Sequence, residues 1–216
     1  MGRAHDDKLK GPGAAGWRRP ALAGAALAVL LVASGFGCGG TAAYNYRKEP
    51  DPRGRGFVLG PADELQITVW KNPALSTSTV VRPDGVITMP LIGDIVAKGL
   101  KPAQLREQIK RRLATYIKDG SAVVTVAVTR VNSYRFTVSG KVSRPGLFTA
   151  PRYVTVREAV AMAGGPTRFA ATEQIFLVRR SKRRVRRIPV DYEAVAMGRK
   201  LEQNLVILAG DVIYVP

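Results

Sequence analysis

Apolar residues alternate with polar ones in short runs along much of the chain, and this period of two predicts β-strands. The clearest run extends from Leu65 to Trp70. Three further β-branched runs follow at 80–81, 86–89 and 92–96, separated by Asn72-Pro73, Pro83-Asp84-Gly85 and Gly93-Asp94. Turn residues at these separations predict a compact, twisted set of short strands that begins near Phe57.

The spacing changes at Pro102, where apolar residues recur every three or four positions. They are Leu105, Ile109, Leu113, Tyr116 and Ile117, with basic residues between them. This spacing predicts an amphipathic helix whose apolar stripe packs on the sheet and which ends at Asp119-Gly120. The Val-rich run at 123–128 is typical of a strand covered on both faces. We therefore predict a first, β-rich domain with one long helix at residues 57–130.

Residues 131–216 predict a second domain built around a shorter helix. Thr155 and Glu158 form a capping-box pattern at its start, and Gly164-Gly165-Pro166 supply a left-handed stop. The strands are expected at 134–138, in a hairpin at 175–178 and 185–190, and in closing runs at 206–208 and 212–215. The whole chain is thus predicted to be α+β, with a β-grasp-like second domain.

The amino-terminal segment indicates export. Arg18-Arg19 precede an uncharged stretch at 20–37, which is typical of a signal peptide over residues 1–37, and residues 38–56 lack an apolar period and predict a tether. The only cysteine, Cys38, directly follows the apolar stretch and resembles the acylated residue of a bacterial lipoprotein, although Gly35 stands where Leu is typical. An uncleaved anchor, or cleavage that leaves a free thiol, is the alternative.

The residue types exclude several kinds of chemistry from the exported part. The only histidine, His5, lies in the predicted signal peptide, so neither a Cys/His metal site nor a histidine-based triad is expected. The candidates for a carboxylate pair lie in turns that contain Gly or Pro, where Asp accepts local backbone hydrogen bonds; they are Asp63, Glu64, Asp84, Asp94 and Asp211. We predict no catalytic residue, no metal, no cofactor and no enzyme activity.

Seven basic residues crowd the tip of the predicted hairpin: Arg179, Arg180, Lys182, Arg183, Arg184, Arg186 and Arg187. The chain also carries a formal net charge of +18, which favours attraction to any polyanion without choosing among them. The hairpin is therefore either a contact for an acidic polysaccharide or anionic headgroups, or a solvated tip. Nucleic acid is not expected as a partner because export removes the chain from it.

A series of turn motifs resembles the outer-membrane polysaccharide export family of the Wza type. The residues that carry the resemblance occur in family order: Gly60, Asp63, Pro83, Asp84, Gly85, Pro145, Gly146, Gly164, Gly165, Gly210 and Asp211. One departure is Ala62, which replaces the second glycine of the family's Gly-Pro-Gly-Asp motif. A positive φ at Ala62 would cost on the order of 1 kcal/mol.

The resemblance implies a polysaccharide export (PES) domain at 57–130 followed by one SLBB domain, a soluble ligand-binding β-grasp, at 131–216. It implies a homo-oligomeric ring in the periplasm, anchored to the outer membrane by lipid, that conducts a capsular polysaccharide or an exopolysaccharide. The expected partners are this polymer and the inner-membrane polysaccharide co-polymerase, often a tyrosine autokinase.

Pore-forming family members add further SLBB repeats and a carboxy-terminal membrane helix, and we expect this protein to have neither. A separate outer-membrane barrel protein is therefore expected as a third partner. The alternative function is a monomeric periplasmic module that binds a saccharide through its SLBB domain.

Overall fold

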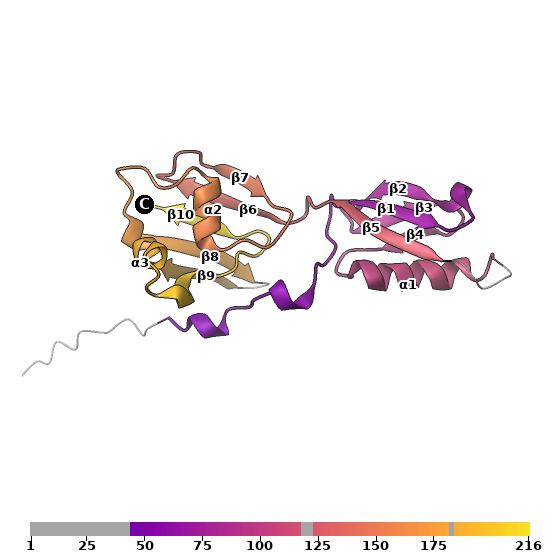
Figure 1. Ribbon diagram of the computed structural model, residues 1–216, viewed down its shortest axis with the longest axis horizontal. Helices are drawn as coiled ribbons and strands as arrows, with labels where there is room; N and C mark the ends of the chain where they lie inside the picture. The colour runs from indigo at the N-terminus through magenta and orange to yellow at the C-terminus, as the bar shows by residue number, and fades with distance from the viewer. Residues whose placement is uncertain (1–43, 118–122, 182–183) are drawn as a thin grey trace, which may run out of the picture. The chain divides into compact units, whose positions relative to one another are not determined.

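The computed structural model describes residues 44–117, 123–181 and 184–216, which contain two groups of strands with separate hydrophobic cores (Figure 1). The described residues all belong to one compact unit. The predicted signal peptide and Cys38 lie outside them. Among the helices that the structure describes, none combines the length and the hydrophobicity that a membrane crossing requires.

The first group of strands follows the predicted alternation. β1 (Glu64–Val69) pairs antiparallel with β2 (Thr77–Val80) and with β5 (Val124–Arg130), and β3 (Val86–Met89) pairs with β4 (Gly93–Val96) in a separate hairpin. The helix α1 (Pro102–Leu113) lies against β5. Alternate side chains of β1 and one stripe of α1 face each other in the core: they are Leu65, Ile67, Val69, Leu105, Ile109 and Leu113. Burial of this stripe explains why the sequence forms a helix here.

Two predictions for this group were wrong. The helix ends at Leu113, and Tyr116 is 56% exposed instead of extending the buried stripe. The predicted stop at Asp119-Gly120 lies outside the described residues. The Val-rich run forms an edge strand in which Val124 is buried and Thr125 is exposed, so it is not covered on both faces. A helix on one face of a three-stranded sheet leaves the other face in solvent.

The second group is a mixed sheet of five strands in the order β7-β6-β10-β8-β9. These are β6 (Arg135–Gly140), β7 (Gly146–Thr149), β8 (Ile175–Ser181), β9 (Arg184–Val190) and β10 (Val212–Val215). The helices are α2 (Val156–Met162), which lies across the sheet in Figure 1, and the short α3 (Tyr192–Ala196). The core lies on one face of the sheet, where Phe136, Leu177 and Ile213 are fully buried with the apolar side of α2.

The ends of α2 match their sequence signals. The backbone N–H of Glu158 donates to Thr155 Oγ1 at 3.4 Å, and the backbone N–H of Thr155 donates to Glu158 Oε2 at 2.7 Å. Gly164 and Gly165 have φ values of 80° and 79°, the left-handed conformation that glycine adopts without steric cost. The capping box and the glycine stop are therefore confirmed.

Of the two predicted closing runs, only the second forms a strand of the sheet. Val206 makes only an isolated bridge with Thr155, so residues 206–208 are not a strand of the sheet. The strand predicted at 212–215 is confirmed as β10, which lies in the middle of the sheet, parallel to β6 and antiparallel to β8. At the end of this pairing the backbones approach closely, because a Cβ on Gly140 would lie 2.0 Å from the Val215 carbonyl oxygen. The central place of β10 makes the last turn of the chain part of the domain's core.

Candidate functional site

The basic hairpin divides its side chains between the two faces of the sheet. Arg179 pairs with Arg186 and Arg180 pairs with Val185, and successive side chains on a strand point to opposite faces. Arg179 and Arg186 therefore point to the core side, and Arg180 and Arg187 point to the other side. Lys182 and Arg183 lie outside the described residues. The basic run is thus not one continuous surface.

Arg179 is a buried structural residue. Its side chain is 2% exposed, and its guanidinium group donates to Asp211 with Nη2 2.6 Å from Oδ2. The same Nη2 donates to the Val206 carbonyl oxygen at 2.7 Å, and Nη1 donates to Glu49 Oε2 at 2.8 Å. The prediction that Arg179 contacts a polymer is corrected here, because a buried guanidinium group with these partners has no free donor surface to offer a large ligand.

Glu49 completes this cluster from the predicted tether. Its side chain is 2% exposed, Arg186 Nη1 lies 2.5 Å from Oε1, and the Tyr44 hydroxyl group donates to the same oxygen at 2.5 Å. We call Tyr44, Glu49, Arg179, Arg186 and Asp211 the buried ion cluster. The segment 44–49 is therefore held against the second domain. Nothing local in the sequence indicates this contact, since Glu49 and Arg179 are separated by 130 positions.

The buried ion cluster shifts the pKa values of Glu49 and Tyr44 in opposite directions. Burial alone would raise the pKa of Glu49, but the hydrogen bonds from Tyr44 and Arg179 and the charges of Arg186 and Arg179 outweigh it, so the pKa lies below the ordinary value. Burial, together with the hydrogen bond to Glu49, raises the pKa of Tyr44 to about 12. Glu49 is therefore ionised and Tyr44 is neutral near pH 7.

Asp211 links the last turn motif to this cluster. Its Oδ2 accepts a hydrogen bond from the Leu208 backbone N–H at 2.7 Å, and Gly210 has a φ of 85°. The carboxylate thus closes its own turn and neutralises Arg179 at the same time. The prediction that Asp serves turns is confirmed at this position, and the pairing with Arg179 is an additional role that the sequence did not indicate.

Asp63 has a similar structural role in a different place. It is fully buried and accepts hydrogen bonds from the backbone N–H groups of Gly60, Asn132 and Ser133 at 2.8 to 2.9 Å, and from the Ser133 hydroxyl group at 2.8 Å. These bonds tie the turn before β1 to the chain segment that leaves β5. A Cβ on Gly60 would lie 2.6 Å from Ser133 Cβ, which explains the glycine.

Ala62 adopts the conformation that its motif requires. Its φ is 74°, in the left-handed region where a side chain costs on the order of 1 kcal/mol. The surrounding hydrogen bonds hold it there: the Ala62 N–H donates to the Val81 carbonyl oxygen at 2.7 Å, and the Ala62 carbonyl oxygen accepts from Asn132 Nδ2 at 3.0 Å. The strain expected from the sequence is therefore present.

The remaining turn motifs divide into two places. Pro145-Gly146 and Gly164-Gly165 come together, because the Ser143 N–H donates to the Gly165 carbonyl oxygen at 3.0 Å. Pro83-Asp84-Gly85 lies apart from them in the β2–β3 turn, where Asp84 Oδ1 accepts from the Val86 N–H at 3.2 Å. The motifs therefore shape separate turns and do not converge on one reactive centre.

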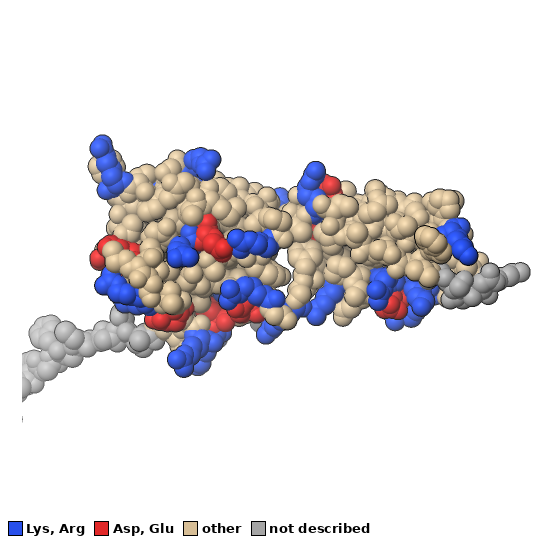
Figure 2. Space-filling view, in the orientation of Figure 1, with Lys and Arg blue, Asp and Glu red and all other residues tan. Residues whose placement is uncertain are grey.

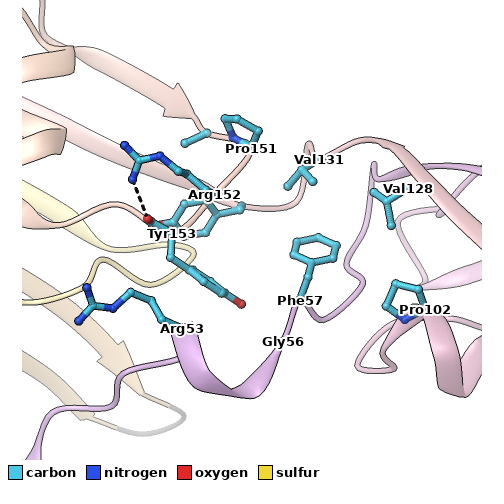
Figure 3. Close-up of a pocket in the computed structure, with 11 residues that line it drawn as sticks. Arg53, Gly56, Phe57, Pro102, Val128, Val131, Pro151, Arg152 and Tyr153 are labelled. Carbon is cyan, nitrogen blue, oxygen red and sulfur yellow. Dashed lines mark hydrogen bonds between the residues drawn. The ribbon is translucent and has the colours of Figure 1, made fainter.

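A largely apolar pocket of about 360 Å³ lies near the start of the first group of strands (Figure 3). The ring of Phe57 projects into it, and Pro102, Val128 and Val131 line it beside Tyr153, whose carbonyl oxygen accepts a hydrogen bond from Arg152 Nη1 at 3.3 Å. Sequence reasoning missed this pocket because its lining comes from distant parts of the chain.

Basic side chains appear in several separate groups on the surface that Figure 2 shows, with acidic side chains beside some of them. In the described part of the chain, no group of three or more His, Cys, Asp or Glu residues is placed to hold a metal ion.

Comparison with known proteins identifies both groups of strands. Residues 51–129 match the family described as polysaccharide biosynthesis/export protein, and residues 135–191 match the SLBB domain. The chain belongs to the polysaccharide export family. The first matched segment covers the first group of strands and the second covers β6 to β9 of the second group, in the order that the turn motifs indicated, while β10 lies after the second match.

Curated relatives of this export-family chain come from two kinds of bacteria. It is 30% identical over 133 residues to the EPS I polysaccharide export outer membrane protein EpsA of Ralstonia solanacearum, covering 50% of this chain and 35% of EpsA. It is 26% identical over 185 residues to the capsule polysaccharide export protein BexD of Haemophilus influenzae, covering 76% of this chain and 45% of BexD. The chain spans less than half the length of these relatives.

Proposed function

We propose that this protein is a periplasmic, outer-membrane-associated component of a polysaccharide export channel and that it conducts the polymer without chemical conversion. The observation that carries the proposal is the succession of an export-family segment and an SLBB segment in one chain. The names of the relatives EpsA and BexD, which refer to export of an exopolysaccharide and a capsule, support the same function. In this proposal the cargo is a capsular polysaccharide or an exopolysaccharide.

The proposed assembly is a homo-oligomeric ring that receives polymer from an inner-membrane co-polymerase. Acylation of Cys38 would attach the ring to the outer membrane. A buried Glu49 supports a defined path for the chain after the anchor, because the ion pairs with Arg179 and Arg186 hold residues 44–49 to the second domain. Native mass measurement of the detergent-solubilised protein tests the ring, and a single-subunit mass at high concentration would contradict it.

Deletion of the gene tests export directly. We expect the deletion strain to lose surface polysaccharide while cell lysates still contain polymer, and a plasmid copy to restore the surface polymer. Surface polymer is measured with a polymer-specific antibody or by sugar analysis of washed cells. A deletion strain with normal surface polymer would exclude the proposed function. A Cys38→Ser copy, followed by labelling with a radioactive fatty acid, tests the anchor separately.

A further inference from the structure

The five-stranded sheet has a second face that the core does not use. Core residues on β6, β8 and β10 alternate with residues that point away from the core, and the hydrophobic core includes none of the latter. These outward residues are Thr137, Ser139, Phe176, Val178, Val212 and Tyr214. Tyr214 is 41% exposed, and Leu147 on the neighbouring β7 is 63% exposed. Within the described residues, this face is therefore accessible.

Strand register brings two aromatic rings together on this face. Tyr214 lies opposite Phe176 on one side and Ser139 on the other, and the two ring centroids are 5.1 Å apart with planes inclined by 34°. The guanidinium carbon of Arg187 lies 3.7 Å from the centroid of Phe176. We call Ser139, Phe176, Arg187 and Tyr214 the aromatic face.

The charged residues within the five strands all carry a positive charge. Arg135, Arg180 and Arg187 occupy outward positions, and the five strands contain no Asp or Glu. Two copies joined through the same face would bring arginine against arginine, which opposes a symmetric contact between subunits. A negatively charged partner without positive charges fits this surface better than a second copy of the chain does.

We propose that the aromatic face binds an acidic sugar segment of the exported polymer; this inference rests on the function proposed above. Aromatic rings offer a flat, apolar surface to the C–H face of a sugar ring, and the Tyr hydroxyl adds a polar group. Arg187 supplies paired N–H donors suited to a carboxylate, and Ser139 supplies a hydroxyl group. The ligand class is therefore a polyuronate or another carboxylated glycan, bound across β6, β10, β8 and β9.

The chain contains its own matched control. Phe169 is 66% exposed, and the guanidinium carbon of Arg168 lies 4.6 Å from its ring centroid, but this pair lies in the loop between α2 and β8 and not on the sheet. Arg184 is an exposed arginine of the same hairpin whose position in β9 points to the opposite face from Arg187. Phe169→Ala and Arg184→Gln therefore remove a ring or a charge without touching the aromatic face.

Calorimetric titration of the full-length protein in detergent tests the proposal with hexagalacturonate as the acidic probe and maltohexaose as the neutral one. We expect the wild type to bind hexagalacturonate, and Tyr214→Ala and Arg187→Gln each to weaken binding about tenfold. The control variants should stay within about twofold of the wild type. Circular dichroism and thermal unfolding verify that each variant is folded.

Three results would overturn the inference. They are a wild type that does not bind hexagalacturonate, an Arg184→Gln variant as weak as Arg187→Gln, and a Tyr214→Ala variant that loses subunit association while keeping its sugar affinity. The first excludes the ligand class, the second shows attraction to net charge only, and the third makes this face a contact between copies. Each leaves the deletion experiment unaffected, so this inference and the proposed function fail on separate observations.

Discussion

The two faces of the β8–β9 hairpin carry similar arginines in opposite environments. On the core side, Arg179 is 2% exposed and contacts Asp211 and Glu49, and Arg186 reaches the same glutamate. On the outer side, Arg187 lies over an aromatic ring next to solvent. A dense run of basic residues in a strand therefore contributes to two separate surfaces, because successive side chains point to opposite faces of the sheet. On the core side Arg179 is held by buried partners, whereas on the outer side Arg187 remains beside solvent.

The largest loss of stability is expected when Arg179 is replaced. In Arg179→Gln, Asp211 and Glu49 lose their shared cation inside the protein, and we expect the free energy of unfolding to fall by about 3–5 kcal/mol. The matched control is Arg180→Gln, which removes the next charge on the exposed side and should change stability by less than about 0.5 kcal/mol. Urea unfolding followed by circular dichroism measures both. Equal effects would mean that the two faces do not differ.

A smaller effect is expected when Glu49 is neutralised. Glu49→Gln keeps the size of the side chain but removes the charge opposite Arg179 and Arg186, which should destabilise the protein by about 1–3 kcal/mol. The segment 44–49 should also be released, so trypsin should cleave after the exposed Arg47 and Lys48 faster than in the wild type. Glu173→Gln, at an exposed position, is the control. Unchanged cleavage in Glu49→Gln would show that the segment is held by other contacts.

Acid should release the same segment reversibly. Because the folded pKa of Glu49 lies below its ordinary value, its contribution to stability is complete above the ordinary pKa and is lost as the pH falls through the lowered one. We expect the protection of residues 44–49 against hydrogen exchange to persist at mildly acidic pH and to disappear in stronger acid. In Glu49→Gln this pH dependence should be absent; if it remains, a group other than Glu49 controls the release.

The smallest losses of stability are expected at Arg186 and Arg187, which are neighbours in β9 but point to opposite faces. Arg186→Gln removes a partly exposed ion pair and should cost about 1 kcal/mol, whereas Arg187→Gln removes only the contact with Phe176 and should cost about 0.5 kcal/mol. Sugar binding should show the reverse order, with Arg187 affected and Arg186 not. If loss of Arg186 weakens sugar binding as much, the two faces are not separate in function.

Local signals predicted the fold well where one segment contains both parts of the interaction. The capping box of Thr155 and Glu158 and the glycine stop after α2 depend on residues within a few positions of one another. The stripe of Leu105, Ile109 and Leu113 likewise follows from helical spacing alone. Strand alternation, applied to 179–187, would also have separated the basic residues of the hairpin.

Predictions failed where the outcome depends on a distant partner. The Val-rich run forms the edge strand β5, which pairs with β1 alone and is covered by a helix on one face only. The central place of β10 in its sheet depends on its parallel pairing with β6. Glu49 was assigned to a tether because its partners Arg179 and Arg186 lie far along the chain. Neither propensity nor periodicity reports which strands become neighbours.

The order of residues along the chain was enough to predict the export family and the positions of the turns, because Gly, Pro and Asp act through local backbone geometry that does not depend on the rest of the fold. It also determined that the carboxy-terminal hairpin is strongly basic. The contacts that these basic side chains make depend on the tertiary structure. Burial brought Glu49 and Asp211 to Arg179, and sheet register brought Tyr214 to Phe176. Charge is a property of residues, but its availability depends on which residues the fold places beside it.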